Sequence, residues 1–224
     1  MHNIPTTKEL FDLSHSIAGE YLAKFTYPWE ALSGLKDFII ELGSSLSKEE
    51  YDNPSENVWI AKDAKVAPTA CINGPCIIDH GAEIRHCAFI RGSAIIGKNS
   101  VFGNSCEIKN SIIFDDAQTP HYNYVGDSIL GWHSHMGAGS ITSNIKSDRT
   151  NIVIRCGKEA LETGRYKIGA ILGDYVEVGC NSVLNPGTIV GKSSNIYPLS
   201  SVRGVVRENS IYKSSTNIVL KDFR

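Results

Sequence analysis

The chain has 224 residues, 42% of them hydrophobic, with a formal net charge of −2. This composition indicates a globular protein with enough apolar residues for a sizeable core. The balanced charge, without long basic runs, argues against nucleic acid or an anionic membrane as a partner, and no apolar run is long enough to span a bilayer.

The first 57 residues are predicted to form a small helical unit followed by a linker. Residues 6–25 and 29–43 carry apolar side chains at helix-like spacing, and Tyr27-Pro28-Trp29 separates them. Residues 43–57 are rich in Ser, Lys, Glu, Asn and Pro, as is typical of a linker. Repeat folds need their ends covered, so we expect an N-terminal cap over the fold that follows, with partner binding as the alternative.

A repeat of six residues begins at Ile60 and predicts the fold of the next segment. Large apolar residues recur every six positions, and a small residue follows four positions after most of them. Neither a helix nor simple strand alternation gives this period. The large positions are Ile60, Val66, Ile72, Ile78, Ile84, Ile90, Ile96, Phe102, Ile108 and Phe114, and later Leu172, Val178, Leu184, Val190, Ile196 and Val202. The pattern predicts an all-β solenoid over residues 58–206.

Two segments break or leave this repeat, and residues 207–224 follow it as a C-terminal tail. The register changes between Phe114 and Leu130, and the segment 115–124 is predicted to interrupt the stacked wall. Such interruptions often carry function, which makes His121 a candidate. Residues 145–167 form a predicted loop insertion with six Lys or Arg residues, either a solvated loop or an arm that holds phosphates.

The six cysteines contain no CxxC pair, and no signal peptide is recognised. We therefore expect reduced thiols and a cytoplasmic protein, with most of the thiols serving for packing. The cysteines are Cys71, Cys76, Cys87, Cys106, Cys156 and Cys180.

The repeat and two motifs resemble a known family over about residues 58–212. The motifs are the seven residues His121-Tyr-Asn-Tyr-Val-Gly-Asp127 and the eight residues Gly137-Ala-Gly-Ser-Ile-Thr-Ser-Asn144. They resemble the acetyltransferase domain of bifunctional N-acetylglucosamine-1-phosphate uridyltransferases/glucosamine-1-phosphate acetyltransferases, and especially the archaeal-type sugar-1-phosphate nucleotidylyltransferases. The resemblance implies a left-handed parallel β-helix built from hexapeptide repeats. It also implies a homotrimer.

The resemblance assigns roles to eight residues. It implies that His121 is the general base and that acetyl-CoA is the acyl donor, bound between neighbouring solenoids. No metal is required in that reading. The implied substrate-binding residues are Arg91, Lys109, Tyr124, His135 and Asn144, and the implied acetyl-CoA-binding residues are Ala138 and Cys180.

Arg91 and Lys109 also support a phosphate site by a physical argument. They are eighteen residues apart, so one coil of about 4.8 Å separates them, and two cations this close with no acid between them would repel unless an anion joined them. The acceptor is expected to be an amino-sugar phosphate or a nucleotide sugar. Direct transfer, with the imidazole taking the proton of the amine, is the implied mechanism.

Two departures limit the resemblance. His135 stands where the bacterial enzymes have asparagine, so the acceptor or the acyl group is expected to differ. Residues 1–57 are too short for a nucleotidyltransferase domain and lack its glycine-rich loop. Nucleotide transfer by this chain is therefore not expected. Whether the chain binds a separate nucleotidyltransferase as a partner is left open.

Two alternative functions remain at this stage. One is a scaffold or sugar-nucleotide-binding protein without catalysis. The other is a zinc enzyme resembling the γ-class carbonic anhydrases, although the spacing of His133 and His135 does not match that family. The histidines available to such a zinc site are His80, His86, His121, His133 and His135.

Overall fold

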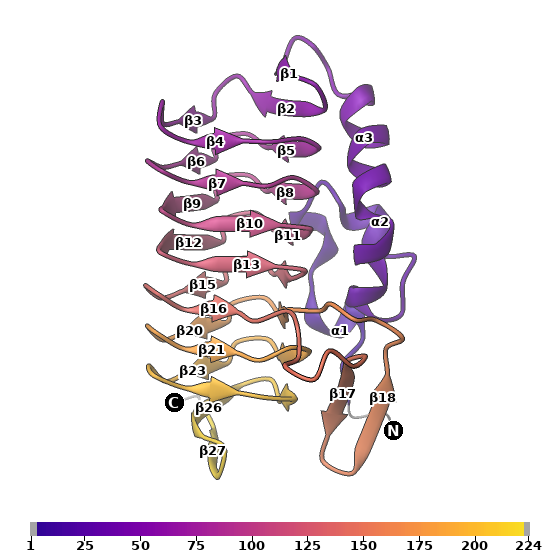
Figure 1. Cartoon of the computed structure of the whole chain (residues 1–224), viewed down its shortest axis with the longest axis vertical. Coiled ribbons are helices and arrows are strands. Elements are labelled where there is room, and N and C mark those ends of the chain that lie inside the picture. The colour runs from indigo at the N-terminus through magenta and orange to yellow at the C-terminus, as the bar shows by residue number, and fades with distance from the viewer. Residues whose placement is uncertain (1–3, 222–224) are drawn as a thin grey trace.

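The computed structural model describes residues 4–221 and shows a three-sided parallel β-helix with helices along one flank (Figure 1). Three sheets, which we name A, B and C, form the sides. The predicted all-β solenoid of parallel coils is therefore confirmed. No helix in the described residues has the length and apolar character needed to cross a membrane.

Each sheet collects one strand from each coil, and the strands pair in parallel except at the two ends. Sheet A contains β1 (Tyr51–Ser55), β2 (Val58–Ala61), β5 (Cys76–Ile78), β8 (Ala94–Ile96), β11 (Ser111–Ile113), β14 (Ile129–Leu130), β19 (Ala170–Leu172), β22 (Thr188–Val190) and β25 (Val205–Val206). Sheet B contains β3 (Lys65–Val66), β6 (Glu83–Ile84), β9 (Val101–Asn104), β12 (Gln118–His121), β15 (His135–Met136), β20 (Glu177–Val178), β23 (Asn195–Ile196), β26 (Ser210–Ser214) and β27 (Asn217–Leu220). Sheet C contains β4 (Cys71–Ile72), β7 (Phe89–Ile90), β10 (Glu107–Lys109), β13 (Tyr124–Gly126), β16 (Ile141–Thr142), β21 (Val183–Leu184) and β24 (Ser201–Val202).

The large residues of the hexapeptide repeat fill the interior of the solenoid. Ile78, Ile90 and Ile108 are buried in one continuous core, together with small residues such as Ala88 and Cys106. Val66, at the first coil, is exposed instead. Burying the same position in every coil stacks the hydrophobic side chains and stabilises each coil through its neighbours.

The position of the register change was predicted wrongly. Ile113 pairs with Ile96 and occupies the interior, five residues after Ile108, so the repeat shortens before Phe114. Phe114 points to the other side of sheet A and packs against Phe11, with ring centroids 4.9 Å apart.

The predicted interruption at residues 115–124 is also wrong. β12 pairs with its neighbours β9 and β15, and Thr119 and Val125 lie fully buried at coil positions. His121 therefore lies at a regular corner of the solenoid. The wall continues through the segment that was expected to leave it.

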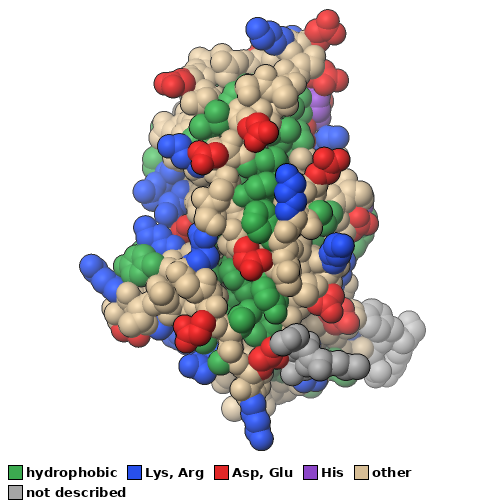
Figure 2. All heavy atoms as spheres, turned by 90° about the vertical axis from the view of Figure 1, so that its right-hand side faces the viewer, with side chains coloured by type: hydrophobic (Ala, Val, Ile, Leu, Met, Phe, Trp, Pro, Cys, Tyr) green, Lys and Arg blue, Asp and Glu red, His purple; other side chains and the backbone are tan. Residues whose placement is uncertain are grey.

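The N-terminal segment covers the outer face of sheet A and does not sit over the end of the solenoid (Figure 1). It contains α1 (Thr7–Leu10), η1 (Leu13–His15), α2 (Gly19–Leu22), η2 (Pro28–Ser33) and α3 (Leu35–Ser45). Ile77, Ile95 and Ile112 face this segment, because sheet A is apolar on both faces. Gly43 permits close contact, since a Cβ there would lie 2.3 Å from the Trp59 ring. Figure 2 shows hydrophobic side chains along the middle of this flank.

Two segments expected to be irregular contain strands. The predicted linker includes the end of α3 and strand β1, which pairs antiparallel with β2. The insertion 145–167 holds a hairpin of β17 (Val153–Cys156) and β18 (Glu159–Glu162). The C-terminal residues 210–220 form the β26–β27 hairpin.

Candidate active site

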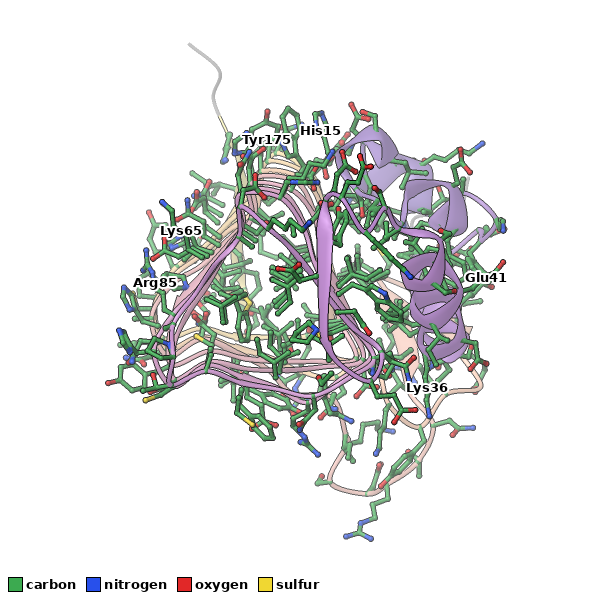
Figure 3. All side chains as sticks on the ribbon, turned by 90° about the horizontal axis from the view of Figure 1, so that it is seen from above. His15, Lys36, Glu41, Lys65, Arg85 and Tyr175 are labelled. Atoms are coloured by element: carbon green, nitrogen blue, oxygen red, sulfur yellow. The ribbon has the colours of Figure 1, made fainter. Side chains whose placement is uncertain are left out.

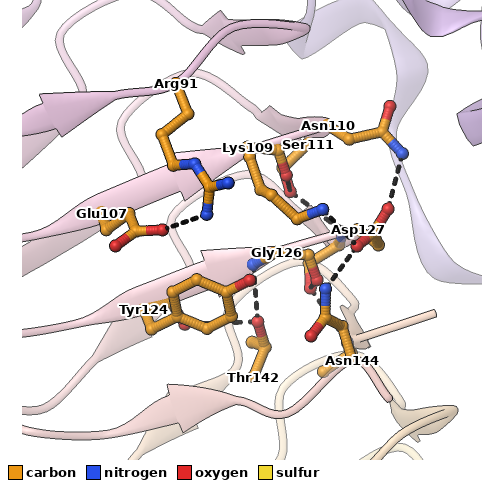
Figure 4. A network of polar contacts seen from close by, with 12 residues as sticks. Arg91, Glu107, Lys109, Asn110, Ser111, Tyr124, Gly126, Asp127, Thr142 and Asn144 are labelled. Carbon is orange, nitrogen blue, oxygen red and sulfur yellow. Dashed lines mark hydrogen bonds and ion pairs between the residues drawn. The ribbon is translucent and has the colours of Figure 1, made fainter. Parts of the chain in front are cut away.

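Arg91 and Lys109 lie on neighbouring coils of sheet C, as their spacing predicts. Ile90 pairs with Ile108, and the backbone N–H of Arg91 donates to the Ile108 carbonyl at 2.9 Å. Each cation also has an acidic partner, however (Figure 4). An Nη of Arg91 donates to Glu107 at 2.7 Å, and Nζ of Lys109 lies 3.4 Å from Asp127. The charge of each cation is therefore partly offset by its own acid, so mutual repulsion alone does not require an anion to join Arg91 and Lys109.

Asp127 organises one end of this group. The side-chain amides of Asn110 and Asn144 donate to its two oxygens at 2.7 Å and 2.5 Å, and Nζ of Lys109 lies 3.4 Å from one of them. Asp127 is 3% exposed. A buried carboxylate with two amide donors and a cation is a rigid negative centre, and it fixes Lys109 and Asn144 relative to each other.

Tyr124 lies beside this group, one coil from Glu107, with which it pairs in the sheet. Burial raises the pKa of its phenol, and the nearby Asp127 and Glu107 carboxylates add to that effect, while Arg91 and a hydrogen bond with Asn144 oppose it. The phenol is therefore protonated at neutral pH and is able to donate a hydrogen bond to a ligand oxygen.

His121 lies at the corner where sheet B turns into sheet C, at the end of β12. Asn123 holds this turn: its Oδ1 accepts the His121 N–H at 3.1 Å, and its Nδ2 donates to the carbonyls of Gly137 and Ser140 at 2.9 Å and 3.0 Å. Asn123 is 2% exposed, whereas His121 is exposed. Within residues 4–221 the imidazole has no hydrogen-bond partner. A fixed backbone with a free, exposed imidazole suits a base that meets an incoming ligand.

His121, Ala138 and Cys180 occupy equivalent positions on three successive coils of this corner. The His121 carbonyl accepts the Gly139 N–H at 3.0 Å, and the Ala138 carbonyl accepts the Asn181 N–H at 2.9 Å. The predicted base and the two predicted acetyl-CoA-binding residues therefore form one column along the corner.

A groove of about 530 Å³ runs beside this column on the outer face of sheet B. Gly137, Gly179, Cys180 and Pro198 line it on the corner side. His135 lines it from β15, where its Nδ1 lies 2.9 Å from a Glu177 carboxylate oxygen. His135 is thus on a different sheet from Arg91, Lys109, Tyr124 and Asn144. Within one chain the candidate residues form a sheet C group and a sheet B group, and the His121 corner separates them (Figure 3 shows the three sides in end view).

Three features of the site were not predicted from the sequence: Glu107, Asn110 and the structural role of Asp127. Asp127 ends the His121–Asp127 motif, which is the one signal that pointed to it. Glu107 and Asn110 flank the repeat residue Ile108 and Lys109 at positions that carry no distinctive pattern.

The histidines weighed for a zinc site have separate surroundings. His80 lies 2.9 Å from Asp63, His86 lies 2.9 Å from Thr69, and His133 stacks on Tyr175. Among the described residues, no group of three or more His, Cys, Asp or Glu side chains is placed to hold a metal ion. The six cysteines are free thiols.

These features define a parallel β-helix of the hexapeptide-repeat type with polar residues on one sheet and at one corner. The chain belongs to the GMPPB C-terminal domain family, whose model matches residues 72–211.

Curated relatives include the "Bifunctional protein GlmU" of Methanococcus maripaludis, which is 33% identical over 198 residues, covering 87% of this chain and 48% of that protein. The "Bifunctional sugar-1-phosphate nucleotidylyltransferase/acetyltransferase" of Sulfurisphaera tokodaii is 33% identical over 116 residues, covering 52% of this chain and 29% of that protein. The chain therefore spans about half the length of the first of these relatives, and less of the second.

Solved structures that the chain matches include the polySia-specific acetyltransferase NeuO. It is 16% identical, with a TM-score of 0.47, and the match covers 75% of this chain and 87% of NeuO.

Proposed function

We propose that this chain transfers an acetyl group from acetyl-CoA to the amine of an amino-sugar phosphate or nucleotide sugar. The observation that carries the proposal is the column of His121, Ala138 and Cys180 beside a groove, with the cations of sheet C on the other side of the same corner. The name of the Sulfurisphaera relative includes acetyltransferase activity, which agrees with this assignment.

In this proposal the sheet C group binds the acceptor. Lys109 and Arg91 hold its phosphate, because charge-assisted hydrogen bonds to phosphate are among the strongest in proteins. Their contacts with Asp127 and Glu107 keep both side chains oriented before the ligand arrives. The neutral phenol of Tyr124 donates to an acceptor oxygen.

His121 then acts as the general base. Neutral imidazole takes a proton from the acceptor amine as the nitrogen attacks the thioester carbonyl, and the C–S bond breaks to release CoA thiolate. Backbone N–H groups near Gly137 and Ala138 are candidates to stabilise the oxyanion. Cys180 is a contact residue for acetyl-CoA in this scheme and forms no covalent bond.

The separation of the two groups within one chain favours a site shared between copies. His135 and the sheet B groove face away from the sheet C group, so a ligand that touches both is expected to lie between neighbouring solenoids. A homotrimer in the cytoplasm is the assembly we propose.

The test is release of free thiol from acetyl-CoA with a panel of amino-sugar phosphates and UDP-amino sugars. We expect one acceptor to be used by the wild type and by His86→Ala, the control at the same corner of an earlier coil. His121→Ala is expected to lose at least about 100-fold in kcat, the range for a general base. If the wild type released no thiol with any acceptor of the panel and did not bind CoA, the scaffold function would be indicated instead.

A further inference from the structure

The inserted segment 145–167 encloses a basic cleft that the acyl-transfer proposal does not use. The cleft has a volume of about 350 Å³ and lies between the β17 side of the insertion and two turns of the solenoid. Its lining includes Lys146, Arg155 and Arg203 and no acidic residue.

Buried residues of the insertion fix the cleft in place. Ile152 and Ile154 are 0% and 1% exposed and pack in the core between sheet A and the N-terminal segment. Because side chains alternate along a strand, Arg155 points away from that core. A Cβ at Gly204 would lie 2.7 Å from the Arg155 carbonyl oxygen, so strand and turn are in close contact.

The charges of the cleft are mostly uncompensated. Lys146 lies 3.3 Å from Asp148, which offsets part of its charge. In residues 4–221, neither Arg155 nor Arg203 forms a salt bridge. Cations that converge on one concave surface raise its positive potential, and guanidinium groups match phosphate oxygens in geometry.

Along the solenoid axis, the cleft is also close to Asn144, one of the residues proposed to bind the acceptor substrate. Thr142 pairs with Leu184, and Leu184 with Val202, so the Pro186 and Arg203 turns lie one and two coils from Asn144. At about 4.8 Å per coil, Arg203 is about 10 Å along the axis from Asn144.

We propose that this cleft binds the diphosphate of a phosphate-bearing small molecule, with Arg155 and Arg203 as the main contacts. The site is distinct from Arg91 and Lys109, and it does not depend on acyl transfer. This diphosphate is part of a nucleotide sugar, part of CoA, or a free ion. The two arginines would recognise it through the same contacts in all three cases.

Calorimetric titration of the full chain with inorganic pyrophosphate at low salt tests the site. We expect binding to the wild type and at least a tenfold weaker affinity, about 1.4 kcal/mol, in Arg155→Ala/Arg203→Ala. The matched control is Lys158→Ala/Lys167→Ala, which also removes two positive charges, both from parts of the insertion outside the cleft. Equal binding by the two double variants, or no binding to the wild type at millimolar pyrophosphate, overturns the proposal.

Two further experiments identify the molecule that carries the diphosphate and test this site independently of the proposed catalysis. Competition by UDP alone indicates the nucleotide sugar, competition by CoA indicates the donor, and competition by neither indicates a free diphosphate. The His121→Ala protein is expected to bind pyrophosphate as the wild type does. Wild-type rates of acetyl transfer in His121→Ala, with pyrophosphate binding retained, would contradict only the function assigned to His121.

Discussion

Nζ of Lys109 lies 3.4 Å from Oδ2 of Asp127, a carboxylate that is 3% exposed and also accepts from Asn110 and Asn144. Removing it leaves the half-buried amide of Asn110, the buried amide of Asn144 and the Lys109 cation without their acceptor. Asp127→Ala is therefore expected to lower the free energy of unfolding by about 2–4 kcal/mol. Urea denaturation measures the loss. Asp148→Ala, which removes an exposed acid next to Lys146, is expected to denature like the wild type, and equal losses in both variants would contradict the role of Asp127.

Lys109 and Cys180 are expected to affect different substrates, because Lys109 lies on sheet C, whereas Cys180 lies in the His121 column and lines the sheet B groove. In the proposed reaction, Lys109→Ala raises the KM for the acceptor about tenfold or more and leaves that for acetyl-CoA unchanged. Cys180→Trp fills the groove and raises the KM for acetyl-CoA instead. Cys180→Ser keeps a wild-type kcat, since the thiol forms no covalent intermediate. Steady-state kinetics with each substrate varied in turn measures the two KM values. A loss of kcat in Cys180→Ser would show that the thiol takes part in catalysis.

Much of the fold could be predicted from the sequence because one period of six dictates the interior. The errors have local causes. The step from Ile108 to Ile113 is one residue short, and Phe114 happened to continue the count, so periodicity alone assigned it to the wrong face. The flanking position of the N-terminal segment had a signal in the pairs Ile77-Ile78 and Ile95-Ile96, since adjacent apolar residues in a strand need cover on both faces.

The candidate site was predictable where coils stack and not where side chains pair. Counting by eighteen places Arg91 and Lys109 on neighbouring coils, and the pairing of Ile90 with Ile108 confirms this placement. Their partners Glu107 and Asp127 were not predictable, because side-chain direction at a corner depends on the turn. Residues His121 and Asn104 are seventeen apart in the register, so the shortened repeat also sets which residues share a corner.

Phe114 is expected to hold the N-terminal segment on sheet A. Its ring packs on Phe11 and is 0% exposed, so Phe114→Ala should cost about 3–5 kcal/mol. Hydrogen exchange should accelerate mainly in residues 10–22. Ile108→Ala makes a cavity inside the solenoid and serves as the control, with faster exchange in the neighbouring coils. The same exchange pattern in both variants would show that segment and solenoid open together.

Tyr51 is expected to make the protein sensitive to alkaline pH. Its hydroxyl donates to Asp79 at 2.5 Å, and burial, followed by this hydrogen bond to a carboxylate, raises the pKa of the phenol. The folded chain therefore holds this proton more tightly than the unfolded chain, whose tyrosines titrate near pH 10. The stability that Tyr51 contributes is complete below about pH 10 and is lost as pH rises above it.

Thermal denaturation of the wild type and two variants between pH 8 and 11 measures this contribution. Tyr51→Phe should be less stable at pH 8, because Asp79 loses a donor, but its Tm should fall less steeply above pH 10. Tyr122→Phe is the control, since that side chain is 65% exposed, and its curve should run parallel to the wild type. Parallel curves for Tyr51→Phe and the wild type would assign the alkaline loss to other groups. A flatter curve for Tyr51→Phe alone would show that the contact between β1 and Asp79 depends on a protonated phenol.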